Sequence, residues 1–196
     1  LLVFKRRWRQ TLRDEELRLY LFLVFLAVGI ITLSKWLEAG DLSEHGFRES
    51  LFNVVAMMST TGFTTEDFLA WPHLTWIILL TMGVIGSCSG STAGGVKVVR
   101  ILTAIKIIRN EFRRILPPRA VLTLRINQDN LGPDVVQSIF AYTCFFILLV
   151  TVGASTLIVM GLPLFDALGL SISAFSNVGP SIGYAIGPLD SWNELH

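Results

Sequence analysis

The sequence has 196 residues, of which 52% are hydrophobic and only 16% are charged, and its mean hydropathy is +0.60. This composition is too apolar for an ordinary soluble domain and is typical of an integral membrane protein. The formal net charge of +1 gives no indication of a nucleic-acid partner. Cys88 and Cys144 both lie in apolar stretches, which favours buried free thiols over a disulfide or a metal site.

Charged residues are distributed unevenly and predict an orientation in the membrane. Fourteen of the sixteen Lys and Arg residues lie in 5–18 or 97–125. Because cytoplasmic segments of membrane proteins are enriched in Lys and Arg, both ranges are expected on the cytoplasmic side. The stretches 38–67 and 166–194 together carry nine acidic residues and one Arg. They are expected outside, where a negative mouth would concentrate cations.

Two long uncharged runs predict membrane-spanning helices. The first extends from Leu19 to Ser34. Arg18 and Lys35 at its ends can snorkel, which brings the helix close to the ~20 residues needed to span a bilayer. The second predicted span covers about 135–160.

Two short apolar segments are each followed by a turn of small residues around a glycine. The segments are 47–58 and 162–174, and the turns are Ser59–Thr65 and Phe175–Ser181. An offset of 117 residues aligns Gly62 with Gly179 and Ser59 with Ser176. One such turn alone is equally compatible with an ordinary turn of a soluble protein. The second copy favours a duplicated re-entrant pore loop, since irregular backbone is tolerated at membrane depth only where it is buried or lines water.

The uncharged run 68–96 is interrupted by residues 86–95, in which four of ten residues are Gly and four are Ser or Thr. Each Gly in a helix interior costs roughly 1 kcal/mol relative to Ala, so the segment predicts a break in the helix that faces a wet cavity. A phosphate-binding loop is rejected because the Gly-Lys-Ser/Thr ending is missing and no strand precedes the segment. Residues 96–116 interleave basic and apolar side chains, which predicts an amphipathic cytoplasmic helix.

Together these elements predict an all-α integral membrane protein built from helix–pore loop–helix repeats. The predicted segments are a basic cytoplasmic segment (1–16), a first repeat with its pore loop to Thr65 and its broken helix at 86–95 (17–116), a cytoplasmic connector (117–133) and a second repeat (134–196). The second repeat ends without a last helix, so the chain is expected to be a piece of something longer.

The chain resembles the membrane subunit of the Trk/Ktr/HKT superfamily of potassium uptake proteins, and most closely the bacterial Trk type. The resemblance is carried by Ser59–Phe63, the Gly-rich break continued to Lys97, the basic run with Pro118–Val121, and Ser176–Pro180. Members of this superfamily have four helix–pore loop–helix repeats around one pore, as in potassium channels. The resemblance implies that about two of the four are present, the third complete and the fourth without its last helix.

The resemblance also implies the roles of individual residues. It implies a selectivity filter of backbone carbonyls just before each glycine, in which carbonyls replace the hydration shell of K⁺. The filter residues implied are Thr60, Thr61, Gly62, Asn177, Val178 and Gly179, with K⁺ held by the carbonyls of Thr60, Thr61, Asn177 and Val178. The gate-loop residues implied are Gly86, Ser87, Gly90, Ser91, Thr92, Gly94 and Gly95.

The function implied is potassium uptake, by symport or as a channel, through a multi-pass protein of the bacterial inner membrane. The implied partners are membrane lipid, a second copy in a homodimer, and a cytoplasmic ring of nucleotide-binding regulatory subunits. The basic face 97–125 would suit that ring, although positive-inside charge explains it equally well. No cofactor is expected besides the transported K⁺, and no nucleic acid.

Two alternatives stand beside this interpretation. A Na⁺-permeable or mixed K⁺/Na⁺ transporter of the same superfamily is one, although glycine in both turns favours K⁺. A membrane-embedded enzyme is disfavoured because the spans contain no paired carboxylates, no His/Glu metal spacing and no Ser–His pair with a base.

Overall fold

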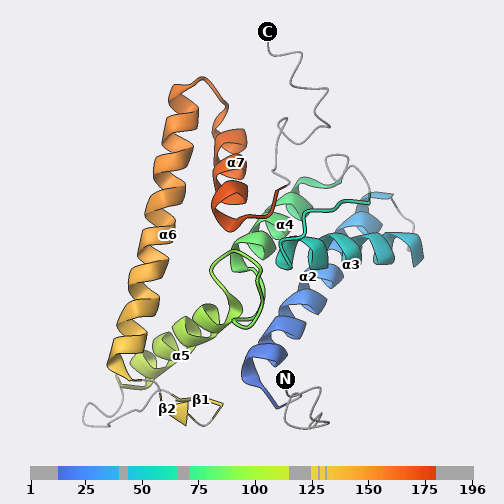
Figure 1. The fold of residues 1–196 in the computed structure, drawn as a ribbon. Coiled ribbons are helices and arrows are strands. Elements are labelled where there is room, and N and C mark those ends of the chain that lie inside the picture. The colour runs from blue at the N-terminus through green and yellow to red at the C-terminus, as the bar shows by residue number, and fades with distance from the viewer. Residues whose placement is uncertain are drawn as a thin grey trace.

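A computed structural model describes residues 13–39, 44–65, 71–114, 125–127, 129–130 and 132–179. The first twelve residues of the basic segment, most of the connector, and everything from Pro180 onwards lie outside the described residues. Within the described ranges the fold is helical apart from one two-residue antiparallel strand pair (Figure 1). The predicted all-α class is confirmed, with this small hairpin as an addition.

The described elements repeat one order twice: a long helix, a short helix and a turn. They are α2 (Glu15–Ala39), α3 (Glu44–Met58), α4 (His73–Ile85), α5 (Val98–Arg114), β1 (Arg125–Ile126), β2 (Asp129–Asn130), α6 (Pro133–Val159) and α7 (Leu164–Ser176). Both predicted spans are present, because Glu15–Glu38 and Asp134–Val159 are long and apolar enough to cross a membrane. With 15 and 13 residues, α3 and α7 are too short to do so at ~1.5 Å per residue.

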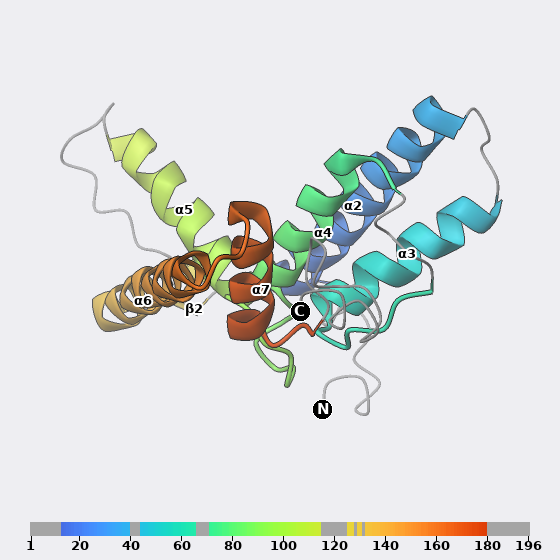
Figure 2. The same cartoon turned by 90° about the horizontal axis from the view of Figure 1, so that it is seen from above.

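The two long helices and α5 have termini at a common end of the molecule. The beginnings of α2 and α6 and the end of α5 lie at the same end of the molecule, at the bottom of Figure 1. This is the end where the charge pattern places the cytoplasm. Seen from above in Figure 2, α7 lies between α6 and α4, and α2 and α3 lie on the far side of α4.

The hydrophobic core lies among α2, α3 and α4. Its buried members are Val24, Ala27, Val28 and Ile31 from α2, Val54, Met57 and Met58 from α3, Leu79 and Met82 from α4, and Trp71, Val98 and Val178. Successive core positions on α2 are one or three residues apart and fall on one stripe of the helix. Val178 belongs to the turn after α7, so the second repeat contributes to the core of the first.

Helix α6 packs against α7 on one face. Gly153 permits the close approach, because a Cβ there would lie 2.6 Å from the Ser171 hydroxyl oxygen. Elsewhere α6 exposes large apolar side chains such as Phe140 and Phe145. The prediction that both cysteines are buried is wrong: both are free, but Cys144 is exposed on α6 and Cys88 is half-buried. Cys144 lies in an apolar stretch, as predicted, but it is exposed because it lies on a face of α6 that is not packed against α7.

Candidate functional site

The turns that follow α3 and α7 end their helices in the same way. In each turn, two backbone N–H groups donate to carbonyls three and five residues earlier, which is the Schellman arrangement. The bonds are Thr60 N to Met57 O (3.1 Å), Thr61 N to Ala56 O (3.0 Å), Asn177 N to Ala174 O (3.2 Å) and Val178 N to Ser173 O (3.0 Å). Every donor and acceptor in the second turn is 117 residues beyond its counterpart in the first. The sequence offset therefore corresponds to a repeated backbone structure.

The backbone angles of the two turns also match. Thr60 and Asn177 have φ of 53° and 55°, and Gly62 and Gly179 have φ of 77° and 101°. Gly adopts this left-handed region freely and Asn tolerates it, whereas a β-branched Thr there is strained. Strain of this kind costs on the order of 1–3 kcal/mol and must be supported by surrounding contacts.

The six predicted filter residues differ in their exposure. Thr61, Asn177 and Gly179 are exposed, Thr60 and Gly62 are half-buried, and the Val178 side chain is buried. Side chains fix the first turn to its helix. Ser59 Oγ lies 2.6 Å from Thr61 Oγ1, and the Asn53 amide donates to Glu49 O at 2.9 Å and to Thr65 Oγ1 at 3.3 Å.

Residues 86–97 leave the line of α4 and return to it, which forms a loop with a narrow neck. Val96 N donates to Val84 O at 2.8 Å, and Lys97 N donates to Ile85 O at 2.8 Å. These bonds satisfy carbonyls at the end of α4 that a helix terminus otherwise leaves unpaired. The helix is therefore interrupted where the Gly and Ser content predicted a break.

Glycine is required at the neck because two backbone segments meet there. A Cβ on Gly86 would lie 2.4 Å from Gly94 O, and a Cβ on Gly95 would lie 2.8 Å from Val84 O. Both glycines also have positive φ, at 70° and 76°. A Cβ on Gly90, by contrast, would meet no atom within 4 Å, because this residue faces open space.

Gly94 places the loop directly beside both turns. Its N–H donates to Thr60 Oγ1 at 3.1 Å. A Cβ on Gly94 would lie 1.9 Å from Ser176 O and 3.2 Å from Asn177 Cβ. The loop thus contacts the turn after α3 through a hydrogen bond and the turn after α7 through close packing. The sequence predicted the loop and the two turns, but not these contacts between them.

Charged and aromatic side chains hold the remainder of the loop. Lys97 Nζ donates to Ser91 O at 2.5 Å, although Lys97 itself has a φ of 77°. At the end of the loop, the Tyr142 hydroxyl of α6 donates to Gly95 O at 3.4 Å, and the Arg100 guanidinium lies 3.7 Å from the Tyr142 ring centroid. A cation over an aromatic ring at this distance is favourable.

An ionic cluster lies near the beginning of α3. Glu49 is buried and accepts from Lys35 Nζ at 2.9 Å, and the His45 ring also contacts its carboxylate. Lys35 Nζ lies 3.9 Å from the Trp71 ring centroid. The cluster ties α2 to α3 and to Trp71, which precedes α4. Across the described ranges, no three His, Cys, Asp or Glu side chains come together as metal ligands.

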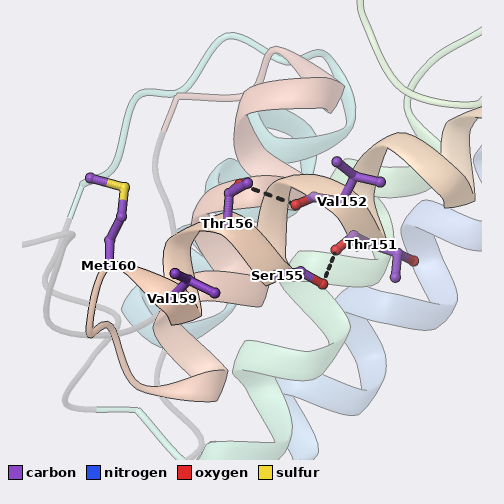
Figure 3. A pocket seen from close by; sticks show the side chains of 6 residues that line it. All are labelled: Thr151, Val152, Ser155, Thr156, Val159 and Met160. Atoms are coloured by element: carbon purple, nitrogen blue, oxygen red, sulfur yellow. Dashed lines mark hydrogen bonds between the residues drawn. The ribbon is translucent and has the colours of Figure 1, made fainter.

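A groove of about 500 Å³ runs along the C-terminal part of α6 (Figure 3). It is lined by Thr151, Val152, Ser155, Thr156, Val159 and Met160. Its hydroxyl groups donate to carbonyls of their own helix, such as Ser155 Oγ to Thr151 O at 2.7 Å. Since these donors are already used and none of the described lining residues is charged, the groove has the character of a packing surface rather than an ion site.

The family model described as TrkH, cation transport protein, matches residues 18–190 of this chain. The chain belongs to the TrkH family. The resemblance predicted from the glycine turns and the Gly-rich break is thereby confirmed at the level of the family.

Relatives of this TrkH-family chain agree with the assignment. It is 31% identical over 184 residues to the Trk system potassium uptake protein TrkI of Halomonas elongata, covering 94% of this chain and 37% of that protein. It is also 31% identical over 184 residues to TrkH of Escherichia coli, covering 93% of this chain and 38% of that protein. The crystal structure of the potassium transporter TrkH from Vibrio parahaemolyticus matches with a TM-score of 0.80 at 31% identity, covering 87% of this chain and 37% of that one. The chain therefore spans little more than a third of the length of these relatives.

The structure also contains site contacts that sequence reasoning missed. Glu16 at the start of α2 binds the loop at Ser89, and Tyr142 of α6 binds the loop at Gly95. Asn127, between the two short strands, binds the first turn of α2. Each joins segments far apart in the sequence, and no local pattern distinguishes these side chains from ordinary polar residues.

Proposed function

We propose that this TrkH-family chain forms part of a pore for potassium uptake across a bacterial inner membrane. The observation that carries the proposal is the pair of turns with matching hydrogen bonds and backbone angles, with Gly94 of the loop packed between them. The names of the relatives, which are potassium uptake proteins, support the choice of ion.

The filter in this proposal consists of the backbone around the two glycines. Carbonyl oxygens of Thr60, Thr61, Asn177 and Val178 would replace water around K⁺, and Gly62 and Gly179 would supply the left-handed backbone that presents them. The matched caps support this role, because carbonyls can coordinate an ion uniformly only if the backbone is held in the same way in each repeat. The exposure of Thr61, Asn177 and Gly179 is consistent with it.

The loop at 86–97 is the gate in this proposal. Its contacts with Thr60 and Ser176 would place it immediately below the filter. The predicted residues divide by role. Gly86 and Gly95 form the neck, Gly94 forms the contact with the turns, and Ser87, Gly90, Ser91 and Thr92 belong to the part that would move.

The wider assembly is part of the same proposal. The segments 1–16, 17–116, 117–133 and 134–196 would be the basic cytoplasmic segment, the third repeat, the connector and the start of the fourth repeat. Membrane lipid would surround the exposed apolar side chains of α2 and α6. A homodimer and a cytoplasmic ring of nucleotide-binding subunits would complete the transporter, with the ring bound on the side that carries residues 97–125.

The test is ion flux through the full-length protein in proteoliposomes, with Rb⁺ as the tracer for K⁺. A deletion within residues 88–93, which spares both neck glycines, is expected to raise basal flux while the K⁺/Na⁺ ratio is retained. A normally assembled deletion variant with unchanged flux would overturn the gate. Equal permeability of the unaltered protein to K⁺ and Na⁺ would favour the mixed K⁺/Na⁺ transporter instead.

A further inference from the structure

Three consecutive acidic residues at the beginning of α2, the capping Asp14 and then Glu15 and Glu16, bind three different segments. Asp14 accepts from Glu16 N at 2.9 Å as a helix cap, and from the Asn127 amide at 3.0 Å. Glu15 N donates to Asn127 Oδ1 at 2.9 Å, and the Glu15 carboxylate pairs with Lys106 of α5. The connector hairpin and α5 are thus both attached to this one turn.

The third acid, Glu16, is attached to the loop. Its carboxylate accepts two hydrogen bonds from the same residue, Ser89 N at 2.5 Å and Ser89 Oγ at 2.9 Å. Ser89 precedes the exposed Gly90 at the tip of the loop, five residues before Gly94. One turn further along α2, the Tyr20 hydroxyl interacts with Ser87 of the same loop.

The neck of the loop is held by backbone hydrogen bonds and Gly94 by the turns, whereas Glu16 acts at the tip. The loop's composition of Gly and Ser provides little apolar surface to bury, and Gly90 faces open space. A flexible segment of this kind loses much conformational entropy when it is ordered. Two hydrogen bonds to a charged carboxylate are stronger than neutral ones, so Glu16 contributes to the ordering of the tip.

We propose that Glu16 is a positioning residue that latches the loop in the place seen here, beside both turns. The proposal rests on the gate function proposed above and adds its control element. Because Lys106 and Asn127 hold the same helical turn, movement of α5 or of the connector on the cytoplasmic side would be transmitted through Glu16 to the loop tip.

The experiment uses the full-length protein in a background in which Cys88 is the sole cysteine. The variants are Glu16→Gln, which keeps the shape of the side chain without its charge, and Ser89→Ala, which removes one of the two hydrogen bonds. Glu15→Gln is the matched control, because it removes a neighbouring charge that contacts α5 rather than the loop. Two quantities are measured: the rate at which a soluble maleimide modifies Cys88, and Rb⁺ flux. Since Glu16→Gln changes the charge beside Cys88, the limiting rates at high pH are compared.

Glu16→Gln is expected to raise the limiting modification rate and the basal flux by roughly three- to tenfold, with an unchanged K⁺/Na⁺ ratio. Ser89→Ala is expected to raise the modification rate and the flux by a smaller factor than Glu16→Gln does. Glu15→Gln is expected to leave both the modification rate and the flux near the values of the unaltered protein. An unchanged modification rate in Glu16→Gln would overturn the latch. An equal rise in Glu15→Gln would assign the effect to the charge of the turn and also overturn it. A faster modification rate without any rise in flux would show that Glu16 tethers the loop but that the loop is not the gate.

Discussion

Gly94→Ala is the sharpest test of the contact between the loop and the two turns. The added Cβ would lie 1.9 Å from Ser176 O, whereas a carbon and a carbonyl oxygen normally approach to about 3.3 Å. The loop must therefore retreat by roughly 1.4 Å, and no rotamer change can relieve the clash because the obstructing atom belongs to the backbone. The retreat would also stretch the hydrogen bond from Gly94 N to Thr60 Oγ1.

Overpacking of this kind costs about 1–3 kcal/mol. If the docked loop is the closed gate, the same energy shifts the equilibrium toward the undocked loop by about 5- to 150-fold. We expect basal Rb⁺ flux of the full-length protein in proteoliposomes to rise within that range. Gly90→Ala is the control, since it adds the same methyl group to the same loop in open space. The K⁺/Na⁺ ratio reports whether the loop or the Ser176 turn has moved.

Equal flux and equal accessibility of Cys88 to a soluble maleimide in Gly94→Ala and Gly90→Ala would refute this reasoning. The position of the loop would then not depend on its contact with the turns. A fall in the K⁺/Na⁺ ratio without a rise in flux would show that the turn yields instead of the loop, which would contradict a mobile gate.

Three further predictions concern the filter, the helix packing and the orientation. Gly62→Ser and Gly179→Ser should each lower K⁺/Na⁺ discrimination, because their φ values of 77° and 101° are unfavourable for a residue with a Cβ, and unchanged ion selectivity in both would exclude a filter here. Gly153→Ala should lower the melting temperature in detergent, since its Cβ would lie 2.6 Å from an α7 hydroxyl at a cost of about 1–3 kcal/mol. Gly29→Ala, with nothing within 4 Å, should instead raise it slightly, and the opposite order would contradict the packing. Arg119→Cys should react with an impermeant thiol reagent only from the cytoplasmic side, and labelling from outside would reverse the topology.

The sequence was sufficient to predict the elements whose cause is local. The uncharged run from Leu19 to Ser34 lies within α2, because a chain that is apolar over that length is stable in a bilayer only as a helix. The offset that aligns Gly62 with Gly179 corresponds to matching backbone angles, since left-handed positions select for residues such as Gly and Asn. The Gly and Ser content of 86–95 likewise indicated the break.

The contacts that hold the site together could not be predicted, because they depend on how distant segments meet. Glu16 and Ser89 are 73 residues apart, and an acidic residue in the first turn of a helix is equally well explained by the helix dipole. Lys97 follows shortly after a glycine pair, and nothing in its side chain indicates a positive φ. The predicted roles of the filter and gate residues remain predictions, since they concern ions and movements rather than backbone geometry.

The two turns carry different residues at the left-handed position that follows each helix, Thr60 and Asn177, and the loop explains this difference. Asn177 occupies the left-handed conformation at little cost, whereas Thr60 holds the same φ under strain of about 1–3 kcal/mol. The Thr60 hydroxyl accepts a hydrogen bond from Gly94 N–H. The other turn meets Gly94 through close packing at Ser176 O. The hydrogen bond to Thr60 thus offsets part of this strain while the loop is docked, and that contribution is lost when the loop leaves. In the proposed function, a displaced loop would therefore change the backbone energetics of Thr60, so the gate and this strand of the filter are energetically coupled.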